Sequence, residues 1–299
     1  MRVSLVTITY NSESVIKSFL ESYNAINYKD LELIVVDNAS TDDTLSIIDD
    51  FNANHHITII KNKQNKGIAS GNNQGIRLAI ENKSDWVLLI NNDVEFEPML
   101  IDKLLGAHDQ YQDSIIVPKM LFYDHPKDIW YAGGFFSKGY INKHRGLGQP
   151  NSTYFIDDIV EYAPTCCALI HRKVFDDVGL MDEKYFVYFD DSDFFFRVLK
   201  DGRHKVRLIN DVEFYHKVGI LTNSRTGDRK KFVHGPFFVK QMTRNYVYFL
   251  KKIGTLRSWF YVFYFFVRVN LRFIFSGKYK RNMETFWLIQ VSYFKGLFM

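Results

Sequence analysis

Two carboxylates stand at positions from which they could bind a divalent metal ion. Asp37 ends one apolar run, and Asp93 follows the apolar run 86–90 and the amides Asn91 and Asn92. Mg²⁺ and Mn²⁺ prefer oxygen ligands, often one or two carboxylates together with substrate phosphates. These residues therefore predict a metal site that also binds a phosphorylated ligand. Taken alone, the Asn-Asn-Asp triplet is more often a strand followed by an Asx-type turn.

Three further acids and a histidine could provide proton transfer and another metal ligand. Asp190, Asp191 and Asp193 follow the aromatic run 185–189 and open a predicted helix. The helix dipole favours an acid at such an N-terminus, but three acids beside aromatic packing are costly and indicate a function. His216 follows a predicted strand. A lone histidine is usually structural, and this one gains significance from the acids elsewhere in the chain.

An alternation of strands and helices must bring these residues together. Apolar runs with strand character span residues 2–9, 31–37, 57–60 and 86–90, and amphipathic helical segments lie between them. This order predicts parallel βαβ units with helices on both faces of a sheet. Parallel strands end at one edge, so Asp37 and Asp93 should lie together where open α/β sheets bind ligands.

The second half of the chain is less regular. We predict a helix over 98–111, a strand over 115–118, hairpins and loops over 119–160, and another strand over 164–170. The last strand contains Cys166 and Cys167, which we interpret as small buried hydrophobic side chains without a chemical role. Two adjacent cysteines cannot build a disulfide framework, which fits a reducing cytosol.

The charge of the chain is divided unevenly. Residues 215–299 hold 16 Lys and Arg against Asp228 and Glu284, whereas the rest of the chain is net acidic. Basic clusters, residues 229–231 among them, alternate with aromatic runs too short to span a bilayer, and no secretory leader opens the chain. This composition favours contact with an anionic membrane surface, with packing on the catalytic domain or a dimer face as the alternative. Nucleic acid is disfavoured, because no nucleic-acid motif is present and the acidic remainder would repel it.

A series of short motifs in a fixed order resembles glycosyltransferase family 2. Within that family the resemblance is to the rhamnosyltransferase-like and galactofuranosyltransferase-like enzymes of bacterial surface polysaccharides. The motifs, which lie within residues 1–250, are residues 3–12, 35–42, 65–75, 89–93, 188–193 and 216–219 and the pair Arg244-Asn245. Each motif is weak alone, and their joint order carries the resemblance.

The resemblance implies an α/β fold of the GT-A type, a Rossmann-like and mostly parallel sheet with flanking helices. A basic, aromatic-rich helical extension would follow it at the C-terminus. We expect a catalytic domain over residues 1–230, with a nucleotide-binding half at about 1–118 and an acceptor half at about 119–230. Residues 231–299 would form a helical tail that associates with a membrane or a second subunit.

The resemblance also implies roles for single residues. Donor-binding roles fall to Thr9, Tyr10, Asn11, Asp37, Asn65, Lys66, Gly67, Asn91, Asn92 and, as a basic position in the pocket, Arg172. Asp93 matches the last acid of the family's Asp-x-Asp metal motif. Because Asn91 replaces the first acid, metal ligation rests on Asp93 and His216. Asp191 matches the catalytic base, and Asp190 stands where the family usually has Glu.

These expectations describe a metal-dependent inverting glycosyltransferase that uses Mn²⁺ or Mg²⁺. It would move a sugar from a nucleotide-diphosphate donor, dTDP-rhamnose before a UDP-sugar, to a lipid-linked or growing cell-surface polysaccharide. Its place would be the cytoplasmic face of the bacterial cell membrane, as a peripheral protein. The alternative is a non-catalytic nucleotide- or glycan-binding scaffold of the same fold.

Overall fold

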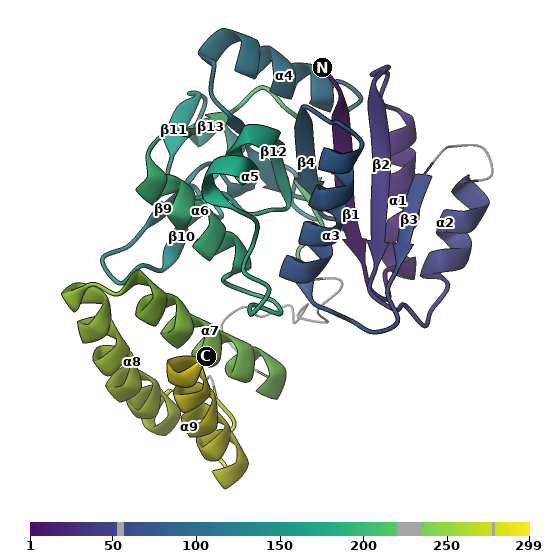
Figure 1. Cartoon of the computed structure of the whole chain (residues 1–299). Helices are drawn as coiled ribbons and strands as arrows, with labels where there is room; N and C mark the ends of the chain where they lie inside the picture. The colour runs from purple at the N-terminus through teal and green to yellow at the C-terminus, as the bar shows by residue number, and fades with distance from the viewer. Residues whose placement is uncertain (53–56, 220–234, 277–278) are drawn as a thin grey trace.

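A computed structural model describes residues 1–52, 57–219, 235–276 and 279–299 of the chain. Its centre is an eight-stranded sheet in the order β11-β13-β6-β12-β4-β1-β2-β3 (Figure 1). The strands of this sheet are β1 (Val3–Thr9), β2 (Leu31–Asp37), β3 (Ile57–Lys61), β4 (Trp86–Ile90), β6 (Ile115–Pro118), β11 (Asp158–Val160), β12 (Cys167–His171) and β13 (Val206–Ile209). The predicted α/β sheet, mostly parallel, is confirmed.

The N-terminal half of the sheet follows the predicted alternation. β1 runs parallel to both β2 and β4, and β2 runs parallel to β3. The helices between these strands are α1 (Glu13–Asn24), α2 (Thr44–Asn52) and α3 (Ile68–Glu81). Right-handed crossovers place α1 and α2 on one face of the sheet and α3 on the other, as Figure 1 shows. β1 and β4 are almost wholly buried, whereas β3 at the end of the sheet is only partly buried. Because β1 and β2 are parallel, Asp37 ends at the same edge as Thr9, its partner in register.

The C-terminal half of the sheet contains a reversal. β12 runs antiparallel to both β4 and β6, and β11 runs antiparallel to β13. β12 begins at Cys167 rather than at residue 164, because Thr165 and Cys166 form a turn. The helices of this half are α4 (Leu100–Tyr111), α5 (Arg172–Val178) and α6 (Asp190–Asp201), and a short 3-10 helix spans Asn151–Thr153.

Two small sheets cover the edge where the acids lie. A four-stranded sheet has the order β5-β14-β7-β8, with β5 (Val94–Phe96), β7 (Met120–Phe122), β8 (Ile129–Tyr131) and β14 (Phe214–His216). A hairpin joins β9 (Gly134–Phe136) and β10 (Asn142–His144). β14 pairs with β5 so that His216 lies opposite Val94. This pairing carries the histidine to the end of β4.

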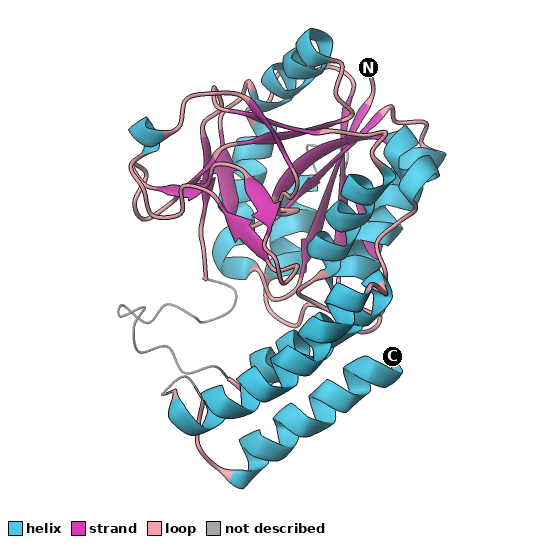
Figure 2. Ribbon diagram, turned by 90° about the vertical axis from the view of Figure 1, so that its left-hand side faces the viewer, coloured by secondary structure: helices cyan, strands magenta, loops and turns pink. Residues whose placement is uncertain are grey.

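Three helices form the C-terminal tail, α7 (Pro236–Ile253), α8 (Leu256–Phe275) and α9 (Met283–Phe298), and α9 lies along α7 (Figures 1 and 2). Gly296 permits this close approach, because a Cβ there would stand 2.4 Å from the Arg244 carbonyl oxygen. Phe189 and Phe196 pack with Tyr246 and Phe249 of α7 in one apolar cluster, which attaches the tail to the part of the chain that forms the sheet. The predicted basic cluster at residues 229–231 lies outside the described residues.

Candidate active site

The carboxyl ends of β1 and β2 form a hydrogen-bonded edge. Asp37 is buried, and its carboxylate accepts hydrogen bonds from Thr9 Oγ1 at 2.8 Å and from the Ser40 amide at 3.0 Å. Asn11 has a left-handed backbone, with φ at 50°, and its side-chain oxygen accepts from the Thr41 amide at 2.8 Å. Tyr10 projects from the same edge with its side chain about half exposed. The structure thus brings together four of the residues predicted to bind a donor.

The loop at residues 65–67 lies beside this edge. The Asn65 side-chain oxygen accepts from the Gly67 amide at 2.9 Å, and the buried Asn38 donates to the Gly67 carbonyl at 3.1 Å. The Lys66 amide faces the same Asn38 side chain at 3.4 Å. Gly67 has φ at +82°, and a Cβ there would stand 2.2 Å from the Phe186 carbonyl oxygen. Only glycine therefore allows this loop to lie against the segment that leads into α6.

The two amides after β4 have different roles. Asn92 is buried and donates to the Ile8 carbonyl and to Ser12 Oγ, both at 2.9 Å, so it holds the connection from β1 to α1. Asn91 contacts Cys166 Sγ at 3.4 Å and lines a cavity. Of the two, Asn91 is the one placed to meet a ligand.

Asp93 and His216 form a buried pair beyond β4. Asp93 Oδ1 lies 3.4 Å from His216 Nε2. Both residues are buried, yet Asp93 Oδ1 accepts no hydrogen bond within the described residues. Burial alone lowers the pKa of His216, but Cys166 and the Asp93 carboxylate outweigh it and raise that pKa to about 10. The raised pKa means that His216 carries a proton beside the Asp93 carboxylate in this structure. A divalent cation bound by the two side chains would replace that proton.

Asp190 and Asp191 open α6 from a strained segment. Tyr188 and Phe189, just before them, have φ at 65° and 68°, a left-handed conformation that is uncommon in aromatic residues. The side-chain amide of Asn245 in α7 donates to the Val187 and Tyr188 carbonyls, both at 2.8 Å. A residue of the tail therefore maintains the backbone from which both acids project.

Asp191 accepts hydrogen bonds from two residues, Tyr162 and Ser192. Tyr162 donates its hydroxyl to Asp191 Oδ2 at 2.5 Å, and the Ser192 amide donates to Oδ1 at 2.6 Å. Burial raises the pKa of Asp191, and these hydrogen bonds partly oppose that shift. Burial and the neighbouring Asp191 raise the pKa of Asp190 to about 8. Two adjacent acids with raised proton affinity are suited to proton transfer near neutral pH.

One cavity of about 600 Å³ joins these groups. Its lining includes Asp93, His216, Asp190, Asp191 and Asn91. The metal candidates Asp93 and His216 and the base candidates Asp190 and Asp191, which come from separate segments of the chain, thus face a shared space. The edge formed by Thr9, Tyr10, Asn11 and Asp37 does not line this cavity.

The placement of Arg172 corrects the prediction that it lies in the donor pocket. β12 runs antiparallel to β4, so the end of β12 pairs with the beginning of β4, His171 with Trp86. The Arg172 amide donates to the Asp85 carbonyl at 3.0 Å, at the amino edge of the sheet. A five-residue strand separates that edge from the acids by about 16 Å, so the prediction for Arg172 is wrong.

Some residues at the site were not predicted. Tyr162 bonds Asp191, Asn38 supports the 65–67 loop, and Trp130 packs edge-on against His216 with ring centroids 4.3 Å apart. Cys166, interpreted as a plain buried side chain, is buried but lines the cavity, 4.0 Å from His216 Nε2. Asn38 stands within a recognised motif and could have been found there. Tyr162 comes from an irregular segment and Trp130 from the short strand β8, and the sequence of neither segment indicates a contact with the site.

Comparisons with known proteins agree with this architecture. The chain is 26% identical over 203 residues to the low-salt glycan biosynthesis hexosyltransferase Agl10 of Haloferax volcanii, covering 67% of this chain and 62% of that protein. It is 25% identical over 235 residues to the N-acetylglucosaminyl-diphospho-decaprenol L-rhamnosyltransferase of Mycobacterium tuberculosis, covering 71% of this chain and 75% of that protein.

A solved structure extends the likeness to the whole fold. The structure of S. aureus TarS 1-349 in complex with UDP-GlcNAc matches with a TM-score of 0.61 at 16% identity, over 99% of this chain and 81% of that one. The predicted GT-A fold is thereby confirmed. The sequence model of Glycosyl transferase family 2 matches residues 4–179, which is more than half of the 299 residues. The chain belongs to glycosyl transferase family 2.

Proposed function

We propose that the protein is a metal-dependent inverting glycosyltransferase. It would move a sugar from a nucleotide-diphosphate donor to a lipid-linked or growing surface polysaccharide. The observation that carries this proposal is the shared cavity, in which the Asp93–His216 pair faces Asp190 and Asp191. The two relatives support it, because one is named as a hexosyltransferase of glycan biosynthesis and the other as a rhamnosyltransferase acting on a lipid diphosphate.

The Asp93–His216 pair fits Mn²⁺ or Mg²⁺. Asp93 Oδ1 lacks a hydrogen-bond donor among the described residues, and His216 Nε2 lies beside it. No cluster of three or more His, Cys, Asp or Glu within the described residues could complete a metal site. The remaining ligands would then be the donor's phosphate oxygens and water, as Mg²⁺ often has. A bound cation would offset the negative charge that grows on the leaving diphosphate.

Asp191 is our candidate for the general base. It would take the proton of the acceptor hydroxyl as that oxygen attacks the anomeric carbon. The new carbon–oxygen bond forms on the face opposite the breaking bond to the phosphate oxygen, which inverts the anomeric configuration. The raised pKa of Asp191 supports this role, because a carboxylate with higher proton affinity is a stronger base.

For the donor we propose dTDP-rhamnose first and a UDP-sugar second. The rhamnosyltransferase relative supports the first choice, and the UDP-GlcNAc named for the TarS structure supports the second. We place the base and ribose at the edge formed by Thr9, Tyr10, Asn11 and Asp37, with residues 65–67 beside them. Asn91 would face the diphosphate from within the cavity.

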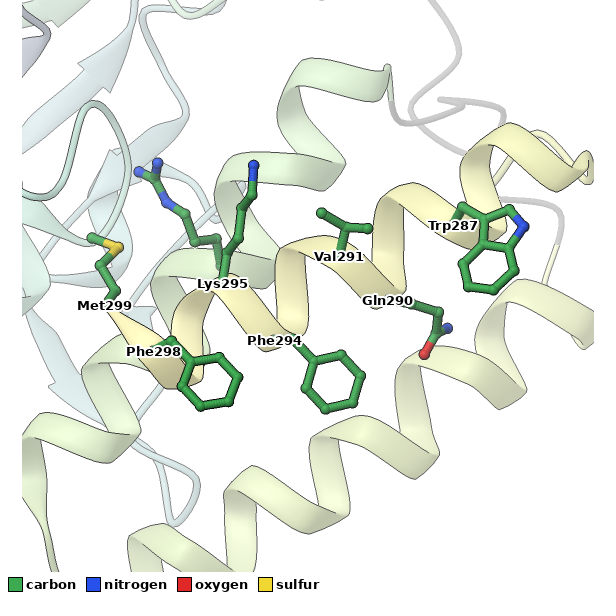
Figure 3. A pocket seen from close by; sticks show the side chains of 8 residues that line it. Trp287, Gln290, Val291, Phe294, Lys295, Phe298 and Met299 are labelled. Carbon is green, nitrogen blue, oxygen red and sulfur yellow. The ribbon is translucent and has the colours of Figure 1, made fainter.

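We propose that the tail lies on the cytoplasmic face of a membrane. α8 and α9 expose large apolar side chains, among them Phe263 (67%) and Phe298 (85%). Figure 3 shows Trp287, Phe294 and Phe298 projecting from α9. These three side chains line a cavity of about 630 Å³, and Arg244 and Lys295 also belong to its lining. Apolar side chains rimmed by basic ones fit an anionic headgroup layer. No helix among the described residues has the length and apolar character needed to cross a bilayer. A second copy of the chain is the competing occupant of this surface.

To test this function, the turnover of donor is measured for the variants Asp93→Ala and Asp191→Asn. The assay is release of dTDP or UDP from a panel of sugar nucleotides with Mn²⁺, and each substitution should reduce turnover at least about 100-fold. Arg172→Gln is the matched control, because Arg172 lies at the opposite edge and its loss should leave turnover unchanged. Donor binding without turnover by the wild-type protein would instead identify a non-catalytic scaffold.

A further inference from the structure

The cavity that contains the acids is walled on its other side by the C-terminal tail. α7 contributes Phe238, Val239 and Met242, and α8 contributes Phe265 and Arg272. On the side of the sheet the lining holds Asp93, Asp190 and Asp191 together with apolar side chains such as Trp130 and Phe189. The lining residues of the helices are mainly aromatic and aliphatic. The cavity is therefore amphipathic, with the reacting groups on one wall and an apolar wall opposite.

Arg272 is the cationic group of the apolar wall. It lines the cavity from the last turn of α8, and no carboxylate among the described residues forms an ion pair with it. Lys252 of α7, by contrast, pairs with Asp182 at 2.7 Å and with Asp193 at 2.8 Å. A guanidinium without a carboxylate partner suits phosphate, which it can bind through two parallel hydrogen bonds.

Apolar side chains that are exposed to solvent lie beside Arg272 on α8. Leu271 and Phe275, its neighbours on the same turn of α8, are 49% and 76% exposed. A ligand bound at Arg272 can thus have one end in the cavity and a hydrocarbon chain along the exposed face of α8. A soluble glycan or a nucleotide has no hydrocarbon chain that could contact this exposed apolar face of α8.

We propose that Arg272 and the apolar wall formed by Met242 and Phe265 bind the diphosphate and the adjoining lipid of a lipid-diphosphate acceptor. This inference rests on the proposed function, since it assigns the acceptor's half of the same cavity. The acceptor's sugar lies toward Asp191, its diphosphate is held by Arg272, and its chain leaves past Leu271 and Phe275. The tail is then part of the acceptor site rather than an anchor alone.

Binding of farnesyl diphosphate to the full chain tests this site without requiring turnover. The titration is run in EDTA with saturating UDP, so that neither the metal pair nor the donor edge captures the probe. Wild-type protein should bind farnesyl diphosphate at least tenfold more tightly than farnesol or inorganic diphosphate. Arg272→Gln should weaken the binding of farnesyl diphosphate about tenfold and leave the affinity for farnesol unchanged. Met242→Asn should weaken the binding of both farnesyl diphosphate and farnesol and leave the affinity for inorganic diphosphate unchanged.

Arg268→Gln is the matched control. Arg268 lies one turn earlier on α8, 6.0 Å from the Tyr264 ring centroid, and does not line the cavity. Its loss should leave the affinity for farnesyl diphosphate unchanged. Equal effects of both substitutions, or none from Arg272→Gln, would overturn the proposal. So would an Arg272→Gln variant that binds phosphatidylglycerol vesicles less but farnesyl diphosphate normally, because Arg272 would then contact headgroups. If the wild-type protein binds farnesyl diphosphate as expected but turns over no donor, the proposed transferase activity is refuted and the lipid-diphosphate site is not.

Discussion

At the scale of single residues, the site depends on carboxyl groups whose proton affinity is set by burial. Asp190 is almost fully buried and has its pKa raised to about 8, with Asp191 as the charged neighbour. In the unfolded chain the pKa of the Asp190 carboxyl lies near its ordinary value of 3.8. Between about pH 4 and pH 8 the native state therefore keeps a proton that the unfolded state releases, and native stability falls as pH rises.

Asp190→Asn removes this penalty, so the variant should be more stable than wild type at pH 8 by at least about 1 kcal/mol. The difference should shrink toward pH 5, where native Asp190 is protonated. Urea unfolding at both pH values measures it. A stability difference that is the same at pH 5 and pH 8 would contradict the assignment.

Tyr162→Phe addresses the base itself. The Tyr162 hydroxyl holds down the pKa of Asp191 that burial raises. Without it the carboxylate should keep its proton to higher pH, so the acid limb of kcat/KM should move up by roughly half to one pH unit. The pH–rate profile is the measurement. A loss of activity that is uniform across pH would mean that Tyr162 is only a structural contact.

At the scale of elements, the sheet and the tail meet at the segment before α6. Asn245 of α7 bonds two carbonyls there, while Tyr188 and Phe189 hold left-handed conformations. These conformations cost free energy and persist only when neighbouring groups support them. The position of Asp190 and Asp191 is therefore determined by a helix outside the sheet.

Asn245→Leu removes both hydrogen bonds and should reduce kcat about 10- to 100-fold, because small displacements of a reacting group are costly. Donor affinity should change little, since the proposed donor edge lies at the carboxyl ends of β1 and β2, away from Asn245. Asn270→Leu is the control within the tail: its side chain bonds Phe266 and Gln290 and does not line the cavity. It should lower Tm and preserve kcat. Equal losses of kcat in both variants would show that Asn245 has no specific role.

The sequence predicted those parts of the site that regular alternation determines. Asp37 and Asp93 could be placed at one edge because strands such as 31–37 and 86–90 are buried runs separated by amphipathic helices. Arg172 could not be placed, because the reversal of β12 leaves no periodic mark in the sequence. Tyr162 lies in irregular backbone and Trp130 in the three-residue strand β8, and tertiary contacts alone bring both to the site.

At the scale of the whole molecule, an acidic catalytic part is joined to a basic, apolar tail. The tail's helices cover one side of the cavity and expose aromatic side chains on the other. One surface thus faces the reacting groups and another faces solvent or lipid. The proposed orientation brings a lipid-linked acceptor to the acids from the membrane side.

Phe260→Glu with Phe263→Glu tests this orientation. Both side chains are more than half exposed on α8 and line no part of the cavity. Each buried Phe is worth about 1.5–3 kcal/mol, so flotation with phosphatidylglycerol vesicles should fall at least tenfold. Turnover of donor in detergent should be unchanged. Normal flotation combined with a loss of dimers in sedimentation velocity would assign this surface to a second subunit.

The hydrogen bonds from Asn245 have a consequence for biosynthesis. Ribosomes release the N-terminal end first, and the carbonyls of Val187 and Tyr188 emerge more than fifty residues ahead of the amide that holds them. A nascent chain can thus complete its sheet while the backbone beside Asp191 still lacks its support. Catalytic competence arrives last, once the polypeptide that also carries the aromatic helices has been made, so a partly synthesised product would consume little sugar nucleotide.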